Sequence, residues 1–408
     1  MHSRTILVGV LCLIVGLFMG GIYLFGPPEP SQSVEPMPWF IALLRGEETL
    51  GFARAFEPRP FSFPADWGPH PEYRIEWWYV TGNLETEDKR HFGYQLTFFR
   101  FALTPNPEER ESAWGANQVY MAHFALTDVE AGQFYAYERF SRAALSLAGA
   151  KAQPFEVWLE NWSIRGTDGD VLPMQLRAAQ ESVSINLTLE SAKNVVLQGN
   201  KGLSYKSTEV GNASYYYSLT RMPTRGTIQI EGETFDLKGL SWFDREWSTS
   251  ALGKDTVGWD WFSIQLDDER ELMFYLLRQR DGRAAPSSDG ILISADGSTR
   301  RLTRDAVQIA VLSHWQSPLD ETRYPSRWRM DIESEGLSLN IKPYLANQEL
   351  TLSVRYWEGA VQVKGRSFGH PVSGNGYVEL TGYGRAEDWK EGRLEGGKGE
   401  GHTQHTRQ

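Results

Sequence analysis

Cysteine is almost absent from this chain of 408 residues. The single cysteine, Cys12, lies in an apolar run near the N-terminus. One thiol cannot form an intrachain disulfide, and no cysteine downstream of it can serve as a nucleophile or a metal ligand. Any chemistry in the body of the chain must therefore come from other side chains.

An excess of positive charge is also missing. The chain has 41 Lys and Arg against 52 Asp and Glu, which gives a formal net charge of −11. Nucleic-acid binding requires a cationic surface that neutralises phosphates. The charge balance therefore argues against a nucleic-acid partner.

The local signatures of common enzyme and cofactor sites are absent as well. The sequence has no GxSxG, no HExxH, no P-loop, and no GxGxxG at a strand-to-helix turn. Its eight histidines are scattered. We therefore predict neither a bound metal nor a cofactor. A serine hydrolase has no local support, although separated residues can assemble such a site.

One long hydrophobic run is present, at residues 6–25. As a helix it would span about 30 Å, enough for a bilayer core. Arg4 precedes the run, and no Lys or Arg follows it until Arg45, so the positive-inside rule places the body outside the cytoplasm. We expect residues 1–26 to be an uncleaved signal anchor in the inner membrane, with the body in the periplasm. A cleaved signal peptide is the alternative.

Beyond this run the sequence is typical of an all-β protein. Apolar residues spaced by two, as in HFGYQLTFFRF at 91–101, favour strands, and 39 Gly and 20 Pro supply turns. No long stretch keeps a helical period. Residues 27–50 form a Pro-rich linker, and residues 386–408 have too little apolar content to fold.

An internal similarity indicates two related β units. WWYVTGNL at 77–84 aligns with WDWFSIQL at 259–266. Each is followed by a polar turn and an apolar strand that ends in arginine, at Arg100 and Arg278. Chance similarity of two hairpins is the alternative explanation. We predict two tandem barrels, 51–232 and 233–385, since each length suits a closed sheet without exposed edges.

Aromatic residues and acids cluster in a few segments. RIEWWYVTGN at 74–83 and SWFDREWSTSALGKDTVGWDWFS at 241–263 are the densest, and YYYSLTR and YWEGAVQVKG add to them. A structural interpretation has these acids paired with arginines such as Arg74 or Arg245. In the functional interpretation, burial raises the pKa of a carboxyl group until it can deliver a proton, while rings stabilise a cation.

Ten segments between about residue 57 and residue 385 carry a specific pattern: HPEYRIEWWYVTGNL, FGYQLTFFR, NQVYMAHFALTD, SYYYSLTR, GLSWFDREWS, GWDWFSIQLDD, LMFYLLR, YPSRW, QELTLSVRYWEGAV and GYVELTGYG. Together they resemble the AttH/CrtC-like family, the relatives of hydroxyneurosporene synthase (carotenoid 1,2-hydratase) that are also described as predicted secreted hydrolases. The resemblance implies two tandem lipocalin-like barrels, which hold apolar ligands in their mouths.

The hydratase branch of this family implies protonation of a terminal isoprenoid double bond, followed by capture of the cation by water. By that resemblance Asp244 corresponds to the acid, Trp242 to an aromatic partner and Tyr217 to a position near an upstream ring. The chain departs from the branch, which has Tyr at the position of Trp242 and Asn at that of Glu246. Arg245, next to Asp244, would also lower the pKa of that acid.

Two functions remain open, and the lipocalin-like scaffold alone does not choose between them. One is a hydro-lyase with Asp244 as its acid. The other is a carrier of a lipid or isoprenoid that serves an ABC-type transporter permease. A third activity, ester hydrolysis, is suggested by the family label alone. The candidate catalytic residues are Asp244, Glu246 and Asp260, and the candidate ligand-binding residues are Trp242, Tyr217, Trp259, Trp261, Trp78, Tyr79 and Glu76.

Overall fold

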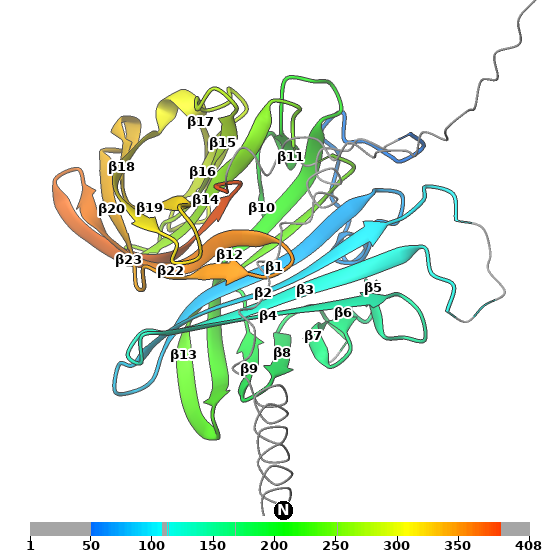
Figure 1. Cartoon of the computed structure of the whole chain (residues 1–408). Coiled ribbons are helices and arrows are strands. Elements are labelled where there is room, and N and C mark those ends of the chain that lie inside the picture. Colours follow the sequence, from blue (N-terminus) through cyan, green and yellow to red (C-terminus); the bar gives the residue numbers. More distant parts are fainter. Residues whose placement is uncertain (1–49, 108–111, 113, 168, 251, 385–408) are drawn as a thin grey trace, which may run out of the picture. The chain divides into compact units, whose positions relative to one another are not determined.

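The computed structural model describes residues 50–107, 112, 114–167, 169–250 and 252–384. These residues form two barrel-like β-sheets within one compact unit, together with three single-turn 3₁₀ helices, Ala65–Trp67, Arg304–Ala306 and Glu333–Glu335 (Figure 1). The prediction of an all-β fold is confirmed. The predicted anchor and tail lie outside the described residues, and within these residues no helix is long and apolar enough to cross a membrane.

The first sheet contains thirteen antiparallel strands of the described chain. Its hydrogen-bonded order is β4-β3-β2-β1-β13-β12-β9-β8-β7-β6-β5, and β10 and β11 also pair with β12. The strands are β1 (Ile75–Glu85), β2 (His91–Ala102), β3 (Gln118–Asp128), β4 (Gln133–Arg142), β5 (Ala148–Lys151), β6 (Glu156–Leu159), β7 (Trp162–Gly166), β8 (Met174–Gln180), β9 (Val183–Leu189), β10 (Val196–Leu197), β11 (Leu203–Tyr205), β12 (Ala213–Ile230) and β13 (Glu233–Ser248).

The second sheet contains ten antiparallel strands of the described chain. Its order is β17-β16-β15-β14-β23-β22-β20-β19-β18, and β21 also pairs with β22. The strands are β14 (Thr256–Leu266), β15 (Glu271–Gln279), β16 (Asp289–Ile293), β17 (Thr299–Thr303), β18 (Gln308–Gln316), β19 (Arg323–Ile332), β20 (Leu337–Pro343), β21 (Glu349–Thr351), β22 (Arg355–Ser367) and β23 (His370–Thr381).

The change from one sheet to the other lies between β13 and β14, not at residues 232 and 233 as predicted. β13 belongs to the first sheet, where it pairs with both β1 and β12. The predicted boundary falls on the hairpin turn between β12 and β13, where Glu231 and Gly232 have φ of +50° and +88°. Two consecutive positive φ values make a tight hairpin turn. We therefore attribute the misplaced boundary to a turn that looks like a domain junction in sequence.

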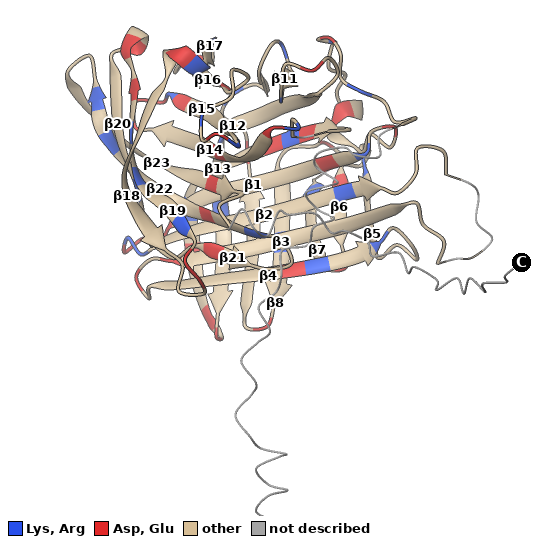
Figure 2. Ribbon diagram, turned by 45° about the horizontal axis from the view of Figure 1, so that its top comes forward, with Lys and Arg blue, Asp and Glu red and all other residues tan. Residues whose placement is uncertain are grey.

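Each sheet curls around its own hydrophobic core. Trp78, Phe243 and Trp247 are buried in the first core, and Trp328 and Trp357 in the second. Most of the strand ribbon carries neither acids nor bases (Figure 2). Both interiors are therefore packed with side chains, as in small barrels whose inward positions are filled.

Polar contacts also hold the two sheets against each other. Glu271 on β15 is fully buried and forms ion pairs with Arg221 on β12 and with Lys193, whose Nζ lies 2.8 Å from the carboxylate. Asn83 Nδ2 on β1 donates to the carbonyl of Gly376 on β23 at 3.0 Å. These contacts fix the relative position of the two sheets.

Candidate functional site

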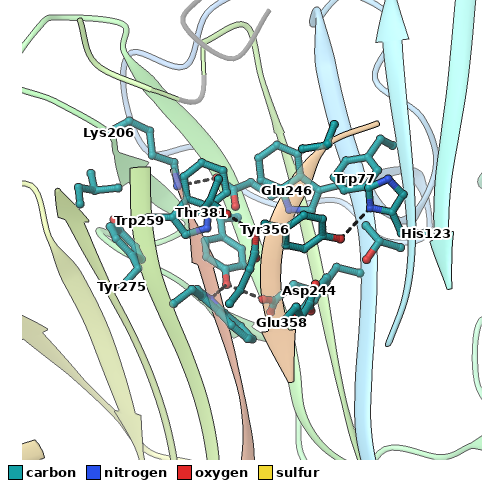
Figure 3. A pocket seen from close by; sticks show the side chains of 18 residues that line it. Trp77, His123, Lys206, Asp244, Glu246, Trp259, Tyr275, Tyr356, Glu358 and Thr381 are labelled. Atoms are coloured by element: carbon teal, nitrogen blue, oxygen red, sulfur yellow. Dashed lines mark hydrogen bonds and ion pairs between the residues drawn. The ribbon is translucent and has the colours of Figure 1, made fainter. Parts of the chain in front are cut away.

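A cavity of about 100 Å³ lies between the two sheets (Figure 3). Strands β1, β2, β3, β12 and β13 contribute one part of its wall, and β14, β15, β22 and β23 contribute the other. It is lined by Trp77, Tyr79, Thr97, Phe99, His123, Lys206, Tyr216, Asp244 and Glu246 from the first sheet and its loops, and by Trp259, Trp261, Tyr275, Leu277, Val354, Tyr356, Glu358, Glu379 and Thr381 from the second.

The position of this cavity differs from the predicted one, which was the mouth of a barrel. Successive side chains of a strand point to opposite faces. On β1, Trp77 and Tyr79 face the cavity, whereas Trp78 packs into the first core. Both faces of these central strands are buried, and the cavity lies at the junction of the sheets, outside the two packed barrel cores.

Asp244 on β13 borders the cavity and is 3% exposed. Its Oδ2 accepts a hydrogen bond from the Tyr216 hydroxyl at 2.6 Å, and its Oδ1 accepts bonds from the Ser218 hydroxyl and from Trp242 Nε1, the latter at 2.7 Å. Burial raises the pKa of Asp244 to about 7, although these three bonds act in the opposite direction. Burial therefore favours the protonated form of this acid.

Aromatic side chains hold the tyrosine partner of Asp244 in place. Trp261 Nε1 donates to the Tyr216 hydroxyl at 3.2 Å. The Trp261 ring meets the rings of Tyr79 and Trp242 edge-on, at centroid distances of 5.2 and 6.3 Å. Rings from both sheets therefore fix the geometry around the carboxyl group.

Two further carboxyl groups line the cavity, and they were not among the predicted site residues. Glu358 on β22 and Glu379 on β23 are paired directly across the two strands. Burial and then the charge of Glu379 raise the pKa of Glu358 well above its usual range, and burial raises the pKa of Glu379 to about 7. YWEGAVQVKG had marked Glu358 as part of an aromatic cluster, whereas no local pattern pointed to Glu379.

Glu246 is the carboxyl group in the cavity that has a cationic partner. Lys206 Nζ lies 2.6 Å from its Oε1, and the Ser214 hydroxyl donates to the same carboxylate. His123, on the side of the first sheet, contacts the Tyr356 hydroxyl at 2.7 Å and Glu138 at 3.0 Å. Lys206 and His123 therefore have acceptor groups beside them already.

The structure brings together some of the predicted site residues and separates others. The cavity is lined by five of them, Asp244, Glu246, Tyr79, Trp259 and Trp261, and a sixth, Trp242, contacts Asp244. The remaining four lie on the opposite faces of their strands and are corrections to the predicted site: Glu76, Trp78, Tyr217 and Asp260.

The partners of Tyr217 and Asp260 explain their burial. The Tyr217 hydroxyl donates to the Asp66 carbonyl at 3.1 Å, whereas the neighbouring Tyr216 lines the cavity and donates to Asp244. Asp260 is bound by Arg278 Nε at 2.9 Å and by the Tyr383 hydroxyl.

Arg245 illustrates the same alternation. It points away from Asp244 and pairs with Glu76. The prediction that Arg245 would lower the pKa of Asp244 is therefore wrong.

Replacement of Asp244 by Asn is expected to change how stability depends on pH. The folded pKa of Asp244 lies above its unfolded value, so the folded state of the wild type loses stability as pH rises from about 4 to 7. An uncharged Asn does not titrate. The stability of Asp244→Asn relative to wild type should therefore increase by on the order of 4 kcal/mol from pH 4 to pH 8. Urea unfolding at both pH values measures this change, and a constant difference would contradict it.

Comparisons with known proteins were consistent with this fold. An AttH-like family model matches residues 54–383. A crystal structure assigned to AttH from Nitrosomonas europaea is 34% identical, with a TM-score of 0.73, and the match covers 81% of this chain and 100% of that one. A crystal structure of kievitone hydratase from Nectria haematococca superposes with a TM-score of 0.61 at 17% identity, covering 81% and 96%.

A curated sequence, kievitone hydratase of Fusarium solani subsp. phaseoli, is 23% identical over 229 residues. That match covers 53% of this chain and 61% of the length of the relative. At 17% identity the solved kievitone hydratase shows a shared fold, and fold alone does not establish activity. The family model covers most of the described chain, and the protein belongs to the AttH-like family.

Proposed function

We propose that this protein is a hydratase that adds water to a carbon–carbon double bond of an apolar, isoprenoid-like ligand. The observation that carries the proposal is Asp244, a buried carboxyl group with a pKa of about 7 that borders a cavity lined by aromatic rings. A general acid works best when its pKa is near the working pH. The resemblance to proteins named kievitone hydratase supports the same class of reaction.

The reaction begins with protonated Asp244. Its proton and the electron pair of the double bond form a new C–H bond, which leaves a carbocation on the neighbouring carbon and a carboxylate on Asp244. The rings of Trp259, Trp261 and Tyr79 stabilise the cation, each by about 0.5–2 kcal/mol. Water then forms the C–O bond and returns a proton to Asp244. Glu246, held by Lys206, accepts a hydrogen bond from that water.

Hydration can be tested directly with the full-length protein. We expect incubation with acyclic carotenoids or shorter isoprenoid alkenes in heavy-oxygen water to give a product with one added water. Mass spectrometry should locate the label in the new hydroxyl group. Absence of a hydrated product from the whole alkene series would contradict the proposal, as would a product without the label.

Transport of an unreacted ligand is the second candidate function. Asp244 is the acceptor in all three of its hydrogen bonds. Each bond therefore stabilises the charged carboxylate relative to the protonated acid that hydration needs. A carrier would need the ring-lined cavity and no proton transfer. Native mass spectrometry of protein from its own membranes separates the two functions, because a carrier should retain an unhydrated apolar molecule.

The anchor and a transporter partner belong to this carrier proposal. Support for them comes from residues 1–26 and from the family resemblance. Inner-membrane attachment through these residues would place the cavity outside the cytoplasm, where an ABC-type permease could exchange ligand with it.

A further inference from the structure

The cavity carries more acidic than basic side chains. Its lining includes four acidic residues, Asp244, Glu246, Glu358 and Glu379. Among the described residues that line it, one has a Lys or Arg side chain, Lys206. Lys206 is already paired with Glu246 (Figure 3), and its Nζ lies 2.6 Å from the carboxylate. Within the described part of the chain, three carboxyl groups of the cavity therefore lack a Lys or Arg partner inside it.

Glu358 is the most unusual of these acids. It is 1% exposed, and in the described chain neither of its carboxyl oxygens makes a hydrogen bond of normal geometry, although the Tyr79 and Tyr356 hydroxyls lie close enough to lower its pKa against the effect of burial. Buried polar groups almost always have partners, because an unsatisfied one costs its desolvation free energy. The carboxyl group of Glu358 lines the cavity opposite Glu379. A ligand that enters the cavity can supply the missing partner.

Aromatic rings surround the same space. The cavity is lined by the rings of Trp77, Tyr79, Trp259, Trp261 and Tyr356. The negative face of an aromatic ring attracts a cation, and rings combined with a carboxylate are suited to ammonium groups. The described residues contain no group of three or more His, Cys, Asp or Glu that could hold a metal ion. An organic cation, which needs no dense shell of ligands, fits this arrangement better than a metal.

We infer that the cavity binds a monovalent organic cation, an ammonium group with a short apolar tail, at the Glu358–Glu379 pair. The tail lies against the aromatic walls, and one carboxylate of the pair neutralises the ammonium charge. A stable ammonium ion would also occupy the place of the carbocation in hydration, and in that respect alone the inference rests on the proposed function. Binding itself requires no reaction.

Proton release should accompany this binding. Two facing carboxyl groups in a buried site cannot both be ionised, so the empty pair holds a proton at neutral pH. A bound cation favours the ionised form and expels that proton. The ionisable and charged groups around the pair, any of which can adjust to the new charge, are Tyr79, His123, Lys206, Tyr216, Asp244, Glu246, Tyr275, Tyr356 and Tyr377.

Three probes with the same tail test this inference: hexylammonium, hexanol and hexanoate. In isothermal titration calorimetry with the full-length protein, the ammonium probe should bind at least about tenfold more tightly than hexanol, and hexanoate should bind most weakly. Titration in buffers of different ionisation enthalpy should show proton release for the ammonium probe only.

Variants locate the site. Glu358→Gln and Glu379→Gln should each weaken binding of the ammonium probe by about tenfold and leave hexanol binding unchanged. Glu190→Gln is the matched control, because Glu190 is exposed and pairs with the exposed Arg225. Equal affinity for the three probes, or unchanged affinity in both cavity variants, would overturn the inference. If a cavity variant fails to fold, the ranking of the probes on the wild type still decides.

The outcomes also separate this inference from the proposed function. A protein that hydrates alkenes but does not prefer the ammonium probe overturns the cation site alone. A protein that prefers the ammonium probe, releases a proton and hydrates no alkene overturns the hydratase alone.

Discussion

Replacement of Asp244 by Asn should lower the rate of alkene hydration by about a hundredfold to ten-thousandfold. Asn keeps the size and one carbonyl oxygen of Asp244, so the hydrogen bonds from Ser218 and Trp242 can remain. It has no acidic proton for the double bond. Initial rates of formation of the hydrated product measure the effect, with circular dichroism as the test of folding.

The pH profile gives this prediction a second measurement. Hydration needs protonated Asp244, so the wild-type rate should fall as pH rises through about 7. The bond from the Tyr216 hydroxyl stabilises the carboxylate and lowers this pKa. Tyr216→Phe removes that bond, and its profile should therefore shift to higher pH. A merely structural effect of Tyr216 would reduce the rate at every pH without moving the profile.

A distant aspartate serves as the control. Asp281 is an exposed residue that pairs with Arg283 at the surface, so Asp281→Asn should hydrate alkenes at the wild-type rate. If Asp244→Asn retained activity within about threefold of this control, Asp244 would not be the acid.

The alternation of apolar residues was enough to predict the β-fold, and the repeated Trp-turn-Arg pattern was enough to predict two units. The sequence did not show which face of a strand borders the cavity. A half-buried strand reveals its inner face through its polar outer face. β1 is buried on both faces, so the prediction selected Glu76 and Trp78 together with Tyr79 and omitted Trp77, which lines the cavity.

The predicted effect of Arg245 on the pKa of Asp244 was wrong for the same reason, because adjacent residues of a strand face opposite sides. Arg245 follows Asp244 in the chain, yet the two side chains lie on opposite faces of β13, and Arg245 contacts Glu76 instead. The facing pair of Glu358 and Glu379 arises only from the pairing of β22 with β23. Such a pair depends on strand register, which composition and local motifs do not specify.

The largest loss of stability is expected from Glu76→Gln. Glu76 is fully buried and forms ion pairs with the guanidinium groups of Arg100 and Arg245, which are also fully buried. These arginines hold other parts of the first barrel as well. Arg100 Nη2 donates to the carbonyls of His70 and Tyr73, and Arg245 Nη2 donates to the carbonyl of Gly68. The neutral amide would leave two buried positive charges without their counter-ion.

We expect Glu76→Gln to lower the free energy of unfolding by about 3–5 kcal/mol at pH 7, measured by urea unfolding. Glu190→Gln removes a carboxylate from an exposed pair and should cost less than about 1 kcal/mol. A loss for Glu76→Gln as small as that of the control would show that Arg100 and Arg245 are satisfied without Glu76.

The dependence of this loss on pH should run opposite to that of Asp244→Asn. The two arginines hold the pKa of Glu76 well below its usual range, so its stabilisation is complete above its unfolded pKa, near 4.5, and fades as pH falls further. The difference between wild type and Glu76→Gln should therefore stay constant from pH 5 to 8 and shrink below about pH 4. Asp244→Asn gains on the wild type between pH 4 and 7, because that carboxyl is buried without a cation. Unfolding curves of both variants across this range thus distinguish a carboxylate whose charge stabilises the barrel from a buried carboxyl group that favours its protonated form.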